Sequence, residues 1–215
     1  MTGFFITFEG GEGAGKTTQI NRLAQKLTDN GHKVITTREP GGTPESEKIR
    51  DLLVQREGGE WSPISEALML FAARSLHTEK VIKPALDGGH IVICDRFTDS
   101  TRAYQGYGHG LDLEIIETLK DKVLDGLEPD LTFILDIEPK AGLSRSERRL
   151  ASESLNIKQK EDRFESMDIS FHEKLRQGFL TIAKQNTDRC HVLDASQSLE
   201  DISKLVASKT LNAIG

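Results

Sequence analysis

The sequence predicts an α/β protein in which helices cover a parallel sheet. Strand-like runs rich in β-branched and aromatic residues alternate with segments of helical periodicity. A glycine-rich phosphate-binding motif also lies between the first expected strand and the first expected helix. A chain of 215 residues can bury a full core as one large domain. We expect a single domain over residues 1–215, since no Pro/Gly/Ser-rich linker and no internal repeat divides the sequence.

The expected strands recur along the whole chain, at residues 4–8, 33–37, 90–94, 131–136 and 191–193. The chemistry at the boundaries of the intervening helices agrees with this pattern. Thr43 and Ser62 each place a capping hydroxyl before a proline at the first helical position. Gly31, the pair Gly88 and Gly89, and Gly126 fall just beyond expected helix ends, where a left-handed residue is common.

The segment between the first strand and the first helix satisfies Gly-x-x-x-x-Gly-Lys-[Ser/Thr]. Its glycines allow backbone N–H groups to close around phosphate oxygens, and the helix start favours negative charge. Lys16 is expected to reach the β- and γ-phosphates and the Thr17 hydroxyl to bind Mg²⁺. The expected nucleotide-binding residues are Gly10, Gly11, Glu12, Gly13, Ala14, Gly15, Lys16, Thr17 and Thr18. The sequence therefore predicts binding of a nucleoside triphosphate, with a glycine-rich surface turn as the alternative.

Composition excludes several other classes of protein. The net charge of −6 gives no overall reason to hold a nucleic acid polymer. Cys94 and Cys190 are isolated, which favours buried packing thiols over a disulfide or a metal site. No apolar stretch approaches the ~20 residues of a membrane span, and the first residues do not resemble a secretory signal. We expect a cytoplasmic protein.

A second polar site is expected where the strand at 90–94 ends. Asp95 and Arg96 place a carboxylate and a guanidinium at the carboxyl end of a strand, where open α/β sheets bind ligands. An arginine can grip a phosphate with two hydrogen bonds, and Asp95 can hold a Mg²⁺-bound water or orient that arginine. A surface ion pair without function is the alternative.

Four segments, GGEGAGKTT, TREPGGT, DRFTDSTRAYQG and DRFE, together resemble the bacterial thymidylate kinase family in their order and spacing. The resemblance covers nearly the whole chain. It implies a P-loop nucleoside monophosphate kinase fold with a five-stranded parallel sheet. It also implies transfer of the γ-phosphoryl group of ATP to dTMP, dependence on Mg²⁺, and a homodimer.

The resemblance assigns roles on the acceptor side. Glu12 corresponds to the acidic residue that contacts the acceptor's 3′-hydroxyl, and Arg96 to the residue that holds the acceptor phosphate. Asp95 corresponds to the residue that helps to organise Mg²⁺. Arg38 resembles a further pocket residue, although an arginine that caps a turn would look the same.

Base recognition is expected from two segments. In the first, Arg74 resembles the family arginine that donates to the thymine carbonyl. The family's base-stacking Phe usually lies four residues earlier, where this chain has Leu70, and Phe71 is rotated from that position by about 100° around a helix. The sequence leaves open whether Phe71 stacks on the base or belongs to the core.

The second segment runs from residue 100 to 106. Ser100 belongs to the expected substrate contacts, while Thr101 and Gln105 resemble groups that read the pyrimidine edge. Tyr104 resembles the ring that crowds the sugar 2′ position and so favours deoxyribose. Packing in the core is the alternative for Tyr104.

The segment at about 145–160 is polar and dense in charge, which predicts a mobile, partly helical lid. In family variants without an arginine in the phosphate loop, a lid arginine stabilises the transferring phosphoryl group. Arg145 and Arg149 align best with that role, and the alternative is a solvated helix end paired with Glu147.

Two other functions stay open from the residues alone. Another pyrimidine nucleoside monophosphate kinase, acting on UMP, CMP or dUMP, would share the phosphate loop and the pair Asp95 and Arg96. A nucleotide-dependent switch protein would also carry the loop. The chain has no Asn-Lys-x-Asp run for guanine, however, and a switch does not need a second phosphate site.

Overall fold

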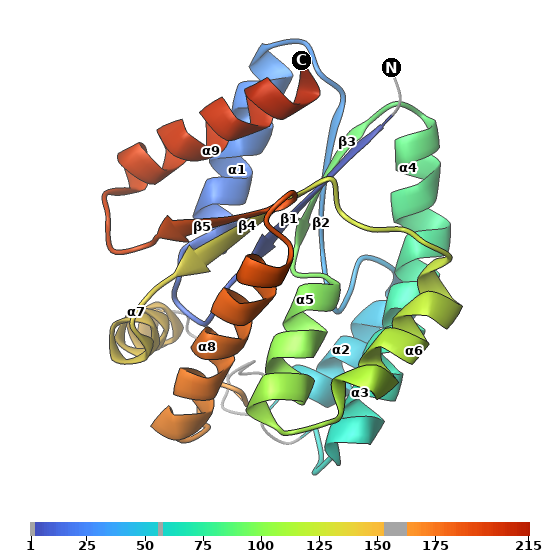
Figure 1. Ribbon diagram of the computed structural model, residues 1–215, viewed down its shortest axis with the longest axis vertical. Coiled ribbons are helices and arrows are strands. Elements are labelled where there is room, and N and C mark those ends of the chain that lie inside the picture. Colours follow the sequence, from blue (N-terminus) through green and yellow to red (C-terminus); the bar gives the residue numbers. More distant parts are fainter. Residues whose placement is uncertain (1–2, 56–57, 153–162) are drawn as a thin grey trace.

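The computed structural model describes residues 3–55, 58–152 and 163–215. At its centre lies a five-stranded sheet with the strand order β2-β3-β1-β4-β5, in which all four pairings are parallel (Figure 1). The strands are β1 (Phe4–Glu9), β2 (Val34–Arg38), β3 (Ile91–Asp95), β4 (Leu131–Asp136) and β5 (Cys190–Asp194). Each bound lies within one residue of the expected one, so the five predicted strands are confirmed.

Helices connect the strands on both faces of the sheet (Figure 1). Two segments, η1 and η2, have the wider π-helical turn. In chain order the helical elements are α1 (Lys16–Asp29), α2 (Pro44–Val54), α3 (Pro63–His77), η1 (Thr78–Ile82), α4 (Lys83–Asp87), α5 (Thr98–Thr101), η2 (Arg102–Gly108), α6 (Leu113–Leu124), α7 (Pro139–Ser152), α8 (Ile169–Gln185) and α9 (Leu199–Ile214).

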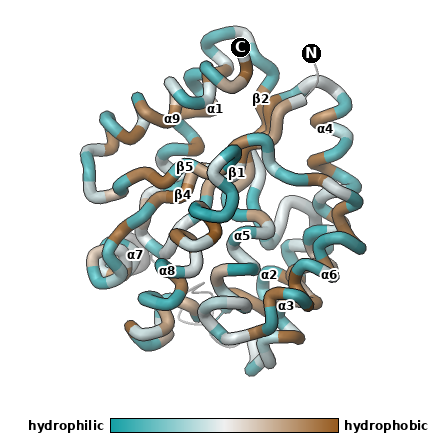
Figure 2. The backbone as a smooth tube through the Cα atoms, viewed as in Figure 1, coloured by the Kyte–Doolittle hydropathy of each residue, from teal (hydrophilic) through white to brown (hydrophobic). Residues whose placement is uncertain are grey.

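Alternate strand residues face opposite layers of helices, because side chains alternate along a strand. On one face, Ile6 and Phe8 of β1 pack with the apolar sides of α1 and α9. On the other face, Phe5 packs with η1, α4 and the end of α6, while Ile134 of β4 packs with α8 and η2. Figure 2 shows the resulting pattern, with apolar residues gathered in the strands and mixed hydropathy along the helices.

The expected boundary chemistry is present. The Thr43 and Ser62 hydroxyls accept hydrogen bonds from the backbone N–H groups of Ser46 and Ser65, three residues further on. Cys94 and Cys190 are free and buried, as predicted. Within the described part of the chain, no helix is both long and apolar enough to span a membrane.

The strand order places the phosphate loop at the point where the chain reverses direction across the sheet. Strand β1 lies between β3 and β4, and the loop begins at its carboxyl end. Ligands of open α/β sheets bind at such a point. The expected lid at about 145–160 lies only partly within the described residues. Its first part, up to Ser152, belongs to helix α7, and residues 153–162 lie outside the described residues.

Candidate functional site

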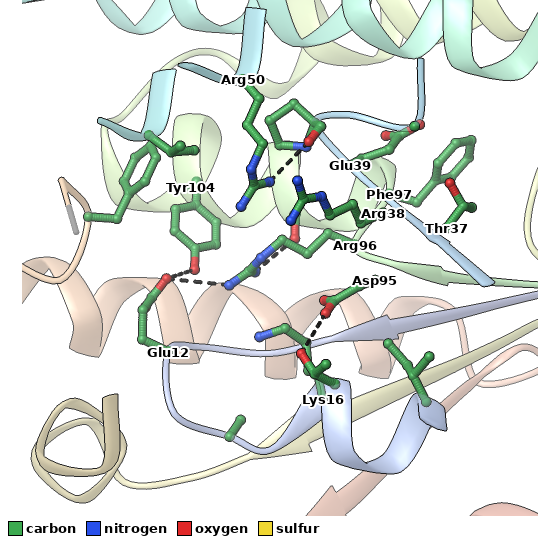
Figure 3. A pocket seen from close by; sticks show the side chains of 18 of the residues that line it. Glu12, Lys16, Thr37, Arg38, Glu39, Arg50, Asp95, Arg96, Phe97 and Tyr104 are labelled. Atoms are coloured by element: carbon green, nitrogen blue, oxygen red, sulfur yellow. Dashed lines mark hydrogen bonds and ion pairs between the residues drawn. The ribbon is translucent and has the colours of Figure 1, made fainter. Parts of the chain in front are cut away.

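A cavity of about 940 Å³ opens at the carboxyl ends of β1, β2 and β3. The phosphate loop and Asp95 form one end of its lining, and α3 and η2 contribute Arg74 and Gln105 at the other. Figure 3 shows polar and charged side chains pointing into this space from several elements. The cavity therefore joins the two regions for which the sequence predicted ligand contacts.

The phosphate loop leaves backbone donors available at the start of α1. Helix α1 begins at Lys16, and its N-cap is Gly15 in a left-handed conformation (φ 90°), which has no side chain to accept from the first N–H groups. The Lys16 ammonium donates to the carbonyl oxygens of Gly10 (3.1 Å) and Gly11 (3.0 Å). Burial lowers the pKa of Lys16 to about 8. An incoming triphosphate would bring negative charge next to this buried ammonium and so favour its charged form.

The loop is also in direct backbone contact with the beginning of α7. A Cβ atom placed on Gly13, which has φ of 65°, would lie 2.0 Å from the carbonyl oxygen of Gly142, and one on Gly142 would lie 2.5 Å from that of Glu12. Only glycine permits this approach at both positions. The phosphate loop therefore packs directly against the N-terminal part of α7.

Thr17 and Asp95 meet at the loop. The Thr17 hydroxyl donates to Asp95 Oδ2 at 3.2 Å, so a hydroxyl and a carboxylate oxygen lie side by side. Mg²⁺ in phosphoryl-transfer sites is typically held by one or two such oxygens, together with waters and substrate phosphates. The chemistry of these two side chains fits the predicted metal.

Arg96 has a left-handed backbone (φ 72°), which is uncommon for a residue with a side chain and which often marks a functional site. This conformation turns the guanidinium toward the phosphate loop, where Nη1 donates to the Gly10 carbonyl (3.0 Å) and to Ser100 Oγ (3.1 Å). Behind it, buried Glu9 accepts from Phe97 N (2.7 Å) and Ser100 Oγ (2.5 Å). Glu9 therefore holds the turn that follows β3.

Glu12 lies between the phosphate loop and η2. Its Oε1 accepts from the Tyr104 hydroxyl and lies 3.4 Å from Arg96 Nη2 (Figure 3). Its Oε2 lies 3.5 Å from His172 Nδ1. Burial opposes ionisation of Glu12, but His172, Arg96, Lys16 and Tyr104 outweigh it and hold the pKa of Glu12 at about 2. Glu12 is therefore a carboxylate at neutral pH, in contact with the ring expected to lie against the sugar.

Three arginines converge above Lys16 and Asp95. Figure 3 shows the side chains of Arg38, Arg50 and Arg96 directed to the same part of the cavity. Arg38 Nη2 donates to Glu47 at 2.9 Å in a half-exposed pair, and Arg50 Nη1 donates to the Pro40 carbonyl at 3.0 Å. This concentration of positive charge suits an anionic acceptor group.

Arg74 is almost completely buried at the other end of the cavity, with 2% of its surface exposed. Its Nε donates to Glu39 Oε2 (2.6 Å), and its Nη2 donates to Thr101 Oγ1 (3.0 Å) and to the Phe97 carbonyl (3.1 Å). The other carboxylate oxygen of Glu39 lies 2.9 Å from His77 Nδ1. Among the described residues, Arg74 Nη1 has no hydrogen-bond partner. Arg74 thus holds one unused donor in a fixed position.

Gln105 complements this donor. It is buried in η2, its Nε2 donates to Glu66 Oε2 at 2.8 Å, and its Oε1 has no hydrogen-bond partner in the part of the chain that is described. Leu70 lines the cavity beside these groups, whereas Phe71 is buried with its ring 4.8 Å from the Arg74 guanidinium. Leu70 is therefore the member of this pair that reaches the cavity, and Phe71 packs in the core.

Most of the predicted site residues line the same cavity. They are Glu12, Gly13, Ala14, Gly15, Lys16, Thr17, Thr18, Arg38, Leu70, Arg74, Asp95, Arg96, Ser100, Thr101, Tyr104, Gln105 and Arg145. Gly10 and Gly11 belong to the phosphate loop but do not line this cavity. They line a smaller hollow against β4 and α8. Arg145 Nη1 donates to the Ala195 carbonyl at 3.0 Å. The side chain of Arg149 lies outside the described residues.

Sequence reasoning missed Arg50, Glu39 and Glu66. Arg50 lies in the charged helix α2, where it resembles an ordinary solvated residue. Glu39 and Glu66 act on cavity residues from 35 and 39 positions away, at Arg74 and Gln105. A local pattern carries no signal for such pairs. The run TREPGGT, however, did mark the turn that contains Glu39.

Comparison with known proteins agrees with the resemblance seen in the sequence. The family model described as thymidylate kinase matches residues 8–206. The chain is 48% identical to a thymidylate kinase of Caulobacter vibrioides over 99% of this chain and 98% of the relative, and 47% identical to one of Magnetococcus marinus over 96% and 94%. A crystal structure of thymidylate kinase from Ehrlichia chaffeensis is 38% identical, with a TM-score of 0.73 and full coverage of both chains.

Proposed function

This chain belongs to the thymidylate kinase family, and we propose that it transfers the γ-phosphoryl group of ATP to dTMP, giving dTDP and ADP. The observation that supports this most directly is the pair of unused polar atoms in one buried wall. Arg74 Nη1 is a donor and Gln105 Oε1 is an acceptor. The edge of thymine offers the complementary pair, an acceptor at O4 and a donor at N3–H. Cytosine offers the opposite pattern.

The proposed transfer needs few covalent steps from the protein. An oxygen of the dTMP phosphate attacks the γ-phosphorus, and the bond to the β–γ bridging oxygen breaks as ADP leaves. The acceptor phosphate is already an anion near neutral pH, so no general base is required. Lys16 and the start of α1 hold the donor phosphates, while Arg96 holds the acceptor phosphate beside Arg38 and Arg50.

Thr17 and Asp95 are the residues proposed to hold Mg²⁺. When bound, the metal neutralises charge on the β- and γ-phosphate oxygens. Arg145, which lines the cavity, and Arg149, which follows it by one helical turn in α7, are proposed as the lid arginines. Their part is to add positive charge from the side opposite Arg96 and to exclude water.

The sugar contacts follow from Glu12 and Tyr104. Glu12 is ionised and can accept from the 3′-hydroxyl of the acceptor, and the Tyr104 hydroxyl donates to Glu12, which supports a place for the Tyr104 ring beside the proposed sugar site. A ribose 2′-hydroxyl would have to fit beside that ring. Preference for deoxyribose is therefore part of the proposal.

A homodimer is proposed from a group of exposed apolar side chains. Helix α3 packs against both α2 and α6. Five apolar side chains on or beside these helices are at least 36% exposed: Leu52 of α2, Trp61 before α3, Ile64 and Leu68 of α3, and Ile115 of α6. A second copy of this chain would cover them. Sedimentation at micromolar concentration should give a dimer, and Leu68→Glu should give a monomer. A wild-type monomer would contradict this part of the proposal.

The reaction is tested by the initial rate of ADP formation with MgATP and, separately, dTMP, dUMP, UMP, CMP, dCMP and no acceptor. Strong stimulation by dTMP supports the proposal. A preference for a different pyrimidine nucleotide would retain the kinase and reject the base contacts. ATP turnover without acceptor dependence would favour a nucleotide-driven switch.

A cytoplasmic location is also proposed, because the ATP pool that supplies such an enzyme is there.

A further inference from the structure

Glu66 of α3 lies behind the cavity wall and meets side chains from two separate segments, one formed by η2 and the residue that follows it, and one that precedes α8. It is 1% exposed. Its Oε2 accepts from Gln105 Nε2 at 2.8 Å and lies 3.9 Å from His109 Nε2, while its Oε1 accepts from Arg163 Nη2. The phosphate transfer proposed above does not use Glu66. A buried carboxylate with this set of partners therefore calls for a different explanation.

The carboxylate decides which way the Gln105 amide faces. A glutamine amide has a donor end and an acceptor end of nearly equal size, and only its partners choose between the two orientations. A carboxylate only accepts hydrogen bonds, so the NH₂ end of Gln105 must face Glu66. Oε1 is then the end of the amide that faces away from Glu66, and it is buried without a hydrogen-bond partner among the described residues.

Arg163 supplies the charge that allows Glu66 to be buried as a carboxylate. The arginine is itself fixed, because its backbone N–H donates to the Val54 carbonyl (3.3 Å) and its Nη1 to the Leu53 carbonyl (2.9 Å) at the end of α2. Its guanidinium also lies 5.2 Å from the Phe164 ring, which contacts the Tyr104 ring at 5.1 Å. Glu66 is therefore held from α2 and from the segment that precedes α8.

We propose that Glu66, held by Arg163, is a positioning residue that sets the orientation of the Gln105 amide and thereby selects a base with a proton on N3 over one without it. The inference rests on the proposed function. Thymine and uracil donate from N3 and satisfy Gln105 Oε1. Cytosine presents a bare N3 acceptor, which would face that oxygen with no proton between them, and an unpaired buried polar group is strongly rejected.

The test is Glu66→Gln, which keeps the size of the side chain but can donate as well as accept. Gln105 is then free to turn its NH₂ end into the cavity. The ratio of kcat/KM for dTMP to that for dCMP should fall at least about tenfold. The loss should appear as a higher KM for dTMP, with kcat at saturating dTMP and KM for ATP near the wild-type values.

Glu117→Gln is the matched control. Glu117 of α6 forms an ion pair with Arg102 of η2. Glu117→Gln therefore removes an ion pair from the same segment and leaves the contacts of Gln105 unchanged. Its dTMP/dCMP ratio should equal that of the wild type. An equal loss in both variants would show that selectivity depends on the general order of η2 and would overturn the inference. So would an unchanged ratio in Glu66→Gln.

A second measurement needs no change at Glu66. The side-chain NH₂ resonances of Gln105, assigned by their loss in Gln105→Met, should stay protected from hydrogen exchange before and after dTMP binds. Protection that appears only with dTMP would place the NH₂ end on the base and overturn the inference. A wild-type protein that shows no preference for dTMP would refute the proposed function itself, and with it the inference. A selective wild type with an unchanged Glu66→Gln ratio would refute only the positioning role.

Discussion

The two ends of the cavity are built in different ways. At the phosphate end, contiguous residues supply the contacts: backbone N–H groups at the start of α1, Lys16 on the same turn, and Asp95 and Arg96 at the end of β3. At the base end, single side chains from distant segments are buried and held in place, Arg74 by an ion pair with Glu39 and Gln105 by a hydrogen bond to Glu66.

This difference corresponds to what each end must recognise. A triphosphate carries high charge and many equivalent oxygens, so backbone donors and one cation can hold it without much regard to side-chain orientation. A base edge carries a few atoms of fixed polarity, so each group that reads it must be held in one orientation. Perturbing the phosphate end should therefore affect rate, and perturbing the base end should affect stability and selectivity.

The largest effect is expected from Lys16→Met. Loss of the ammonium removes positive charge from the transferring phosphoryl group, and kcat should fall about 10³-fold. The Kd for dTMP, measured by calorimetry without ATP, should stay within about twofold, because the base end is intact. Lys26→Met, on the exposed side of α1, is the control and should retain full kcat. A Lys16→Met enzyme with normal kcat would remove the distinction between the two ends.

Stability should respond in the opposite order. Arg74→Met leaves the Glu39 carboxylate buried without its arginine, so the free energy of unfolding should drop by about 3 kcal/mol. Lys16→Met removes a charge that is buried at some cost and should not lower it. Urea unfolding followed by circular dichroism measures both. Adding Glu39→Gln to Arg74→Met should recover part of the loss. No recovery would show that the lost packing, and not the unpaired carboxylate, sets the cost.

The pH dependence of ATP binding should report the phosphate end alone. Without nucleotide the pKa of Lys16 is lowered to about 8 by burial, and bound phosphates favour the ammonium, so its pKa rises in the complex. Below pH 8 the lysine is protonated in both states, and affinity should be constant. Above pH 8 binding takes up a proton, and affinity should fall by up to about tenfold per pH unit. Calorimetry in buffers of different ionisation enthalpy measures that proton. In Lys16→Met both the uptake and the slope should disappear.

Prediction from sequence succeeded where a function is contiguous. The motif at residues 10–17 predicts a phosphate loop by itself, and the end of one strand is enough to place Asp95 and Arg96. The same reasoning could not find Glu39, Glu66 or Arg50, because their importance arises from burial and pairing across the fold. Arg163 lies 97 positions from Glu66, and no periodicity relates them. The sequence also left Leu70 and Phe71 open, since one helical position decides between cavity and core.

A substitution at Leu70 should have the smallest effect of those considered, and it gives the sharpest test of where the base lies. Leu70 is half-buried and lines the cavity beside Arg74. An aromatic ring at this position should stack on a bound base, and Leu70→Phe should lower the Kd for dTMP by about threefold to tenfold. Affinity for ATP should not change, because the phosphate end is untouched. Leu205→Phe, at an exposed leucine of α9, is the control and should leave both affinities unaltered. Weaker dTMP binding in Leu70→Phe would mean that the base already fills the space against Leu70, so that base recognition depends on close packing as well as on the two polar atoms.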